Sequence, residues 1–119
     1  MDNKKNDCYY FLKIVENIAT IKKYFNNATY EEFLSDEKTM DSIMFRFVQL
    51  IENIKSISKE FKLLHPEIDW DDIVGFRNRL VHEYGKTDYV IVYSTIVSDL
   101  DKVTYSHHLK KWGLLARGI

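Results

Sequence analysis

Residues 87–103 read TDYVIVYSTIVSDLDKV, and this stretch decides the fold class of the chain. It is rich in β-branched residues, which are common in strands, so its composition alone is compatible with a strand. Its apolar side chains instead recur at the three- and four-residue steps of a helix. These side chains are Tyr89, Val92, Tyr93, Ile96, Val97, Leu100 and Val103. We therefore predict a helix here, and with it an all-α fold.

Two segments upstream show the same helical periodicity. From Asp7 to Phe25, one face carries Phe11, Ile14, Val15, Ile18, Ile21 and Phe25. From about Asp36 to about Leu64, the corresponding face carries Met40, Met44, Phe47, Ile51, Ile54 and, after a gap at Ser58, Phe61. Pro66 ends this second segment, because the residue before a proline is pushed out of helical geometry. The sequence thus predicts two long helices, the second unbroken to about Leu64.

Capping residues mark the other helices. Thr29 with Glu32 three residues later forms a capping-box pattern, which predicts a short helix over YEEFLS, residues 30–35. Asp69 is a suitable N-cap for a helix from Trp70 to about Tyr84, with Gly85 as its stop. Four main helices joined by short connections, plus the short extra helix, predict an antiparallel four-helix bundle.

Composition agrees with a single helical domain over residues 1–119, with residues from about 104 to 119 as a C-terminal extension. Four glycines and one proline are few for an all-β fold, which needs turn residues every 8–12 positions or so. The net charge of −1 excludes a general basic field, so any contact with phosphates must be local. The single cysteine excludes an intrachain disulfide framework. Without a signal peptide or membrane-length apolar stretch, we expect a cytoplasmic protein with no membrane partner.

The stretch FRNRLVHEYG, residues 76–85, places charge where the bundle needs a core. Arg77 falls on the predicted buried stripe, together with Trp70, Ile73, Val74, Val81 and Tyr84. An arginine cannot lose its charge by deprotonation, so a buried one must be paired. A structural explanation is a guanidinium that meets a carboxylate such as that of Glu52. Asn78 and His82 are four residues apart and share one helix face.

The chemistry of these side chains suits RNA cleavage. An imidazole transfers protons near neutral pH, and a guanidinium holds phosphate oxygens with a fixed set of donors. Cleavage through the 2′-OH needs both kinds of group and no metal. The motif supplies one histidine per chain, His82, which is few for two proton transfers. Two copies of Arg77 and His82 in one cleft would supply them, which makes a homodimer part of the hypothesis.

RNRLVHEY resembles the R-x4-H-x-Y motif of HepT-like proteins, in the HEPN (higher eukaryotes and prokaryotes nucleotide-binding) superfamily. HPEIDWDDIVGFRNRLVHEYG and TDYVIVYSTIVSDL also resemble the family's second half, and the resemblance extends to about Val103. It implies a homodimeric HEPN-like bundle and a metal-independent endoribonuclease without a cofactor, leaving a 2′,3′-cyclic phosphate. Arg77 and His82 would be catalytic, with Asn78 as a helper.

The same resemblance implies a toxin–antitoxin pair. The partner would be an MntA-like nucleotidyltransferase antitoxin, which transfers AMP onto the motif tyrosine, Tyr84 in this sequence. An adenylyl group adds bulk and negative charge beside Arg77, where the RNA phosphate would otherwise bind.

Two other hypotheses remain open. The chain could be a non-catalytic helical module that binds nucleotide or RNA beside a nucleotidyltransferase, or a dimeric scaffold in which Arg77 pairs with Glu52. The near-neutral charge favours the binding module, and the intact arginine–histidine spacing favours the nuclease. Adjacent carboxylates in DWDD, residues 69–72, are typical of a helix start rather than a metal site, so we predict no bound metal.

Overall fold

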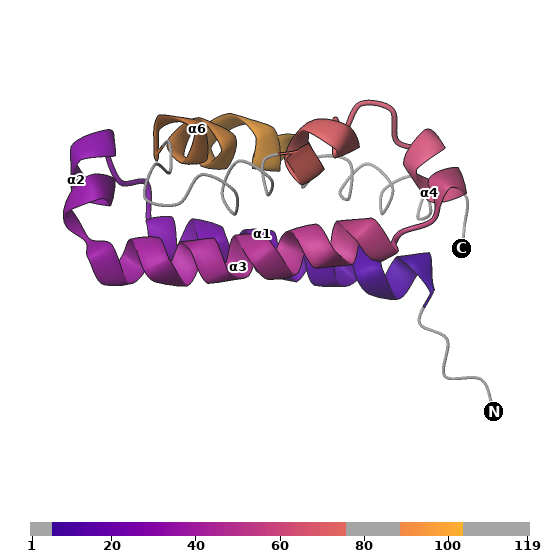
Figure 1. Cartoon of the computed structure of the whole chain (residues 1–119), viewed down its shortest axis with the longest axis horizontal. Helices are drawn as coiled ribbons and strands as arrows, with labels where there is room; N and C mark the ends of the chain where they lie inside the picture. Colours follow the sequence, from indigo (N-terminus) through magenta and orange to yellow (C-terminus); the bar gives the residue numbers. More distant parts are fainter. Residues whose placement is uncertain (1–5, 76–88, 104–119) are drawn as a thin grey trace, which may run out of the picture.

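The computed structural model describes residues 6–75 and 89–103 (Figure 1). In chain order these residues form α1 (Asp7–Phe25), α2 (Tyr30–Ser35), α3 (Glu37–Ser56), α4 (Lys59–Leu63), a helical stretch at 70–75, α6 (Tyr89–Ser94) and the π-helical turn η1 (Thr95–Asp99). Residues 100–103 continue as α-helix. Over these two ranges there is no strand, so the prediction of an all-α fold is confirmed. None of the helices in the same ranges has the length and apolar character to span a membrane.

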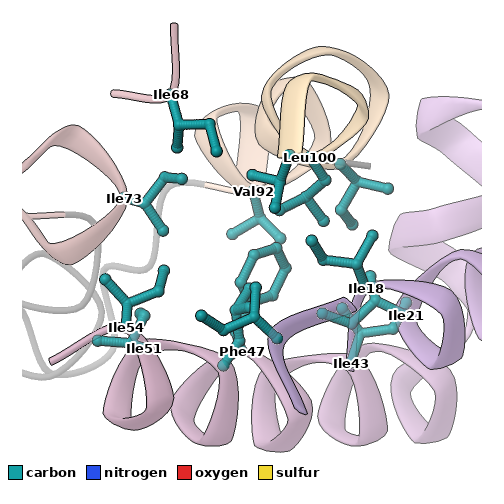
Figure 2. Close-up of a cluster of buried hydrophobic side chains, with 14 of the residues drawn as sticks. Ile18, Ile21, Ile43, Phe47, Ile51, Ile54, Ile68, Ile73, Val92 and Leu100 are labelled. Atoms are coloured by element: carbon teal, nitrogen blue, oxygen red, sulfur yellow. The ribbon is translucent and has the colours of Figure 1, made fainter. Parts of the chain in front are cut away.

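Helices α1 and α3 lie side by side and form one layer, with α6 on one face of that layer (Figure 1). They run antiparallel, because Asp7 at the start of α1 reaches Ser58 just beyond the end of α3. Figure 2 shows the core between the layers, where Ile18 and Ile21 of α1 meet side chains of α3 and the α6 segment. Those partners include Ile43, Phe47, Ile51, Ile54, Val92 and Leu100, each fully buried. The predicted stripes of α1 and α3 are therefore core-facing.

The short connection between α1 and α3 is capped as the sequence predicts. Asn26, with a φ of 50°, ends α1 in the left-handed conformation that asparagine tolerates. The Thr29 hydroxyl accepts a hydrogen bond from the Glu32 amide at 3.1 Å. The Glu32 carboxylate in turn accepts one from the Thr29 amide at 2.8 Å. This capping box starts α2 and confirms the predicted short helix.

The prediction of one unbroken helix from Asp36 to Leu64 is wrong. Helix α3 ends at Ser56, Ile57 is extended with a ψ of 140°, and a new helix, α4, begins at Lys59. Ser58 caps α4 by accepting a hydrogen bond from the Phe61 amide at 3.1 Å. The Asp7 carboxylate accepts hydrogen bonds from the Ser58 hydroxyl at 2.6 Å and from the Ser58 amide at 2.8 Å. These bonds replace the backbone bonds of a continuous helix, which accounts for the break.

The helix predicted over residues 89–103 is confirmed, with one correction to its buried face. Val97 is 41% exposed, although the sequence places it on the apolar stripe. The buried face follows Val92, Thr95, Ile96, Leu100 and Val103 in steps of three and four residues, and Val97 lies outside it. Residues Thr95–Asp99 form the π-helical turn η1. The Thr95 hydroxyl donates to the Ile91 carbonyl at 2.8 Å, inside this irregular turn.

Candidate functional site: the segments that flank the motif

The motif residues Arg77, Asn78, His82 and Tyr84 all lie between residues 76 and 88, outside the described residues. Their predicted roles therefore stay predictions. The structure does describe both flanks of the motif, namely residues 70–75 before it and α6 after it. These flanks determine how the motif is attached to the bundle.

The segment that leads into the motif is tightly fixed. The Asp69 carboxylate accepts a hydrogen bond from the Asp72 amide at 3.0 Å, so its predicted N-cap role is confirmed. Trp70 is 7% exposed, and its indole N–H lies 3.2 Å from the His65 carbonyl oxygen and 3.3 Å from that of Lys62. One turn later, Ile73 enters the core cluster (Figure 2). The chain thus reaches the motif from a firmly packed helical turn.

Sequence reasoning missed His65, to which it gave no role. Its side chain is buried, and its ring centroid lies 5.8 Å from that of Phe11 and 4.7 Å from that of Phe61. Its Nδ1 lies 3.3 Å from the Glu67 carboxylate. Within the described part of the chain, Nε2 is a buried nitrogen with no hydrogen-bond partner. The local sequence does not indicate the full burial, because one of its two packing partners, Phe11, lies 54 positions earlier in the sequence.

A cavity of about 260 Å³ lies between the two flanks. Ile73 comes from the leading turn, and Val90, Ile91, Ser94 and Thr95 come from α6 and η1. Among the described residues, the charged groups that line it are the carboxylates of Asp72 and Asp99, which repel a phosphate. The described lining of this cavity therefore supplies no positive charge for binding a phosphate.

Glu52, the carboxylate considered as a partner for Arg77, is exposed on α3. It borders a groove of about 780 Å³ between α1 and α3, together with Lys13, Glu16 and Arg46. Because Arg77 lies outside the described residues, its pairing with Glu52 remains a prediction.

Known proteins place the motif in a family context. The model of the family described as "Ribonuclease HepT-like" matches residues 14–106, a range that includes both flanks and the motif. A Thermococcus cleftensis protein named "Probable ribonuclease HepT" is 31% identical over 97 residues, covering 82% of this chain and 88% of the relative. A Methanocaldococcus jannaschii protein named as a "Putative RNase" is 26% identical over 95 residues, covering 80% and 78%. No solved structure gives a significant match.

The family model matches most of the chain, and the Thermococcus cleftensis relative is covered over most of its length. The chain belongs to the ribonuclease HepT-like family.

Proposed function

We propose that this chain is a metal-independent endoribonuclease that acts as a homodimer. The observation that carries the proposal is the family match over residues 14–106, which contains the complete series Arg77, Asn78, His82 and Tyr84. The names of its relatives, which describe ribonucleases, support the same reaction class. The substrate would be RNA, because the 2′-OH serves as the internal nucleophile.

The reaction balances without a cofactor. The 2′-oxygen attacks the adjacent phosphorus while a base removes its proton, and the bond to the 5′-oxygen breaks as an acid protonates that oxygen. The products are a 2′,3′-cyclic phosphate and a free 5′-hydroxyl. His82 of one copy acts as the base and His82 of the other as the acid. Arg77 stabilises the negative phosphate oxygens, and Asn78 donates a hydrogen bond that orients the phosphate.

We further propose that Tyr84 is the control point of a toxin–antitoxin pair in the cytoplasm. An MntA-like nucleotidyltransferase would transfer AMP from ATP to the Tyr84 phenolic oxygen, releasing pyrophosphate. Tyr84 is two residues from His82, so an adenylyl phosphate there competes with the RNA phosphate for Arg77. Modification would therefore block substrate binding and leave the fold intact.

Purified variants test this proposal. We expect His82→Ala and Arg77→Ala to abolish RNA cleavage while they elute as the same dimer and melt at the wild-type temperature. Tyr84→Phe should cleave RNA and escape inhibition when the nucleotidyltransferase is co-expressed, because it lacks the acceptor hydroxyl. Full cleavage by His82→Ala would overturn the catalytic assignment. Inhibition of Tyr84→Phe accompanied by a mass increase of one AMP would overturn the modification site.

The alternative of a non-catalytic binding module is favoured by one observation, the net charge of −1. In that function, Arg77 and His82 contact phosphate without turnover. RNA binding that is lost in Arg77→Ala, with no cleavage by the unmodified wild type, would establish the module in place of the nuclease.

A further inference from the structure

Trp70 occupies an unusual position for a core tryptophan. It is the first residue of the helical stretch at 70–75, and its N–H faces two carbonyl oxygens, that of Lys62 in α4 and that of His65 just beyond α4. Each of these oxygens also accepts a backbone hydrogen bond, Lys62 from the His65 amide at 3.1 Å and His65 from the Ile68 amide at 3.2 Å, so the indole is a second donor to both. The indole therefore joins the end of α4 to the start of the segment that carries the motif.

The corner that holds Trp70 is itself tied to α1 at two points. The His65 ring packs between Phe11 of α1 and Phe61 of α4. The Asp7 carboxylate, also in α1, binds both the amide and the hydroxyl of Ser58 at the start of α4. Contacts from α1 thus fix the corner of residues 57–70, and the Trp70 indole joins this corner to the helical stretch at 70–75.

The sequence places the catalytic series shortly after this anchor. Arg77 follows Trp70 by seven residues, which on the helix predicted from Trp70 to Tyr84 is two turns and about 10.5 Å along the axis. A rotation of about 10° at the side-chain radius of about 5–6 Å displaces a side chain by about 1 Å. A misplacement of that size can reduce a reaction rate about 100-fold.

We propose that Trp70 is a positioning residue for the ribonuclease reaction, fixing the start of the segment that carries the motif through its hydrogen bonds to the Lys62 and His65 carbonyls. This inference rests on the proposed function. It differs from a purely structural role because it predicts a loss of turnover in molecules that are fully folded.

The test compares steady-state RNA cleavage by the wild type and Trp70→Phe, well below both melting temperatures. We expect kcat to fall about tenfold or more, with KM changed less than twofold, because phosphate binding by the flexible Arg77 side chain tolerates a small shift better than proton transfer does. A second variant carries benzothienylalanine at position 70, which keeps the shape of the indole and removes only the N–H. It should show the same loss of kcat.

Ile43→Val is the control, because it removes one methylene from the α1–α3 core far from the corner and so lowers stability without touching the Trp70 contacts. It should leave kcat within twofold of the wild type. If Trp70→Phe and the benzothienylalanine variant also retain kcat within twofold, Trp70 has only a structural role and the proposal is wrong.

An NMR readout separates failure of this inference from failure of the proposed function. The His82 imidazole signals should shift in Trp70→Phe and stay in place in Ile43→Val, whether or not the protein cleaves RNA. A wild type that does not cleave RNA overturns the proposed function, and the inference with it, whatever the His82 signals show. A wild type that cleaves RNA, with unchanged kcat and unchanged His82 signals in Trp70→Phe, overturns the positioning inference alone.

Discussion

Replacing Asp7 by asparagine tests the break between α3 and α4. The carboxylate accepts hydrogen bonds from the Ser58 hydroxyl at 2.6 Å and from its amide at 2.8 Å. Asparagine keeps one acceptor oxygen and places an NH2 group opposite the second donor. Hydrogen bonds to a charged group contribute about 1.5–3 kcal/mol, but Asp7 is partly exposed and solvent screens it. We therefore expect Asp7→Asn to lower the free energy of unfolding by about 1–2 kcal/mol.

The assay is thermal unfolding followed by circular dichroism at several pH values. For a domain of this size, the expected loss lowers Tm by about 4–8 °C at pH 7. The hydrogen bond from the Ser58 side chain, followed by that from its amide, holds the pKa of Asp7 below its usual value of 3.8. The difference between wild type and variant should thus be complete above about pH 5. It should shrink as the pH falls below 3.8 through the lowered native pKa, where the wild-type carboxylate is protonated.

Asp41→Asn is the matched control, because Asp41 is exposed on α3. Its substitution should change stability by no more than about 0.5 kcal/mol at any of these pH values. The reasoning is refuted if Asp7→Asn melts with the wild type at pH 7, or if the difference between them is as large at pH 2.5 as at pH 7.

Other substitutions give sharp expectations. Phe47 is 0% exposed and Phe45, on the same helix, is 61% exposed. In chemical denaturation, Phe47→Ala should therefore lower the free energy of unfolding by about 3–5 kcal/mol, and Phe45→Ala by about 0.5 kcal/mol or less. Equal losses would contradict the assigned core. A Cβ added to Gly75 meets no atom of residues 6–75 or 89–103 within 4 Å, so Gly75→Ala should raise stability by about 0.5–1 kcal/mol. A destabilised variant would contradict a helical Gly75 with open space around its Cα. Lys22 and Asp101 form a 2.8 Å ion pair at the surface. Lys22→Ala should therefore lower the free energy of unfolding by about 1 kcal/mol or less, and by still less in 1 M salt. A loss of stability that salt does not reduce would indicate a different interaction.

The parts of the fold that follow from local sequence were predictable. Helix α1 and the capping box at Thr29 depend on residues within a few positions of one another, and both are confirmed. The β-branched stretch at 89–103 is helical because its apolar side chains need one face, and burial of Val92, Ile96 and Leu100 outweighs strand propensity. In these segments the spacing of apolar and capping residues was enough to predict the helices.

The errors arose where a distant contact decides the local structure and at the edge of a buried face. Ser58 interrupts a helical pattern that continues through Phe61, and the hydrogen bonds that favour the interruption come from Asp7. Val97 was assigned to the apolar stripe although it lies at the edge of the buried face formed by Val92, Ile96 and Leu100. His65 packs against Phe11, which is 54 positions earlier in the sequence. The contacts of Ser58 and His65 with α1 are not represented in the local helical period.

In the candidate site too, the features set by nearby residues were predictable and those set by distant contacts were not. The N-cap role of Asp69 and the burial of Trp70 and Ile73 were predicted from the sequence and are confirmed. The anchoring of Trp70 to the end of α4 was not predicted, because it depends on where α4 ends. The catalytic and modified residues themselves lie outside the described residues, so their roles await experiment.

The most direct measurement of the central claim is the end group of RNA cleaved in EDTA. Wild-type protein, shown by intact mass to be unmodified at Tyr84, would be incubated with a labelled structured RNA beside His82→Ala. The account predicts fragments that end in a 2′,3′-cyclic phosphate with the wild type, and uncut RNA with His82→Ala. Uncut RNA with both proteins, or equal cleavage by both, would contradict it.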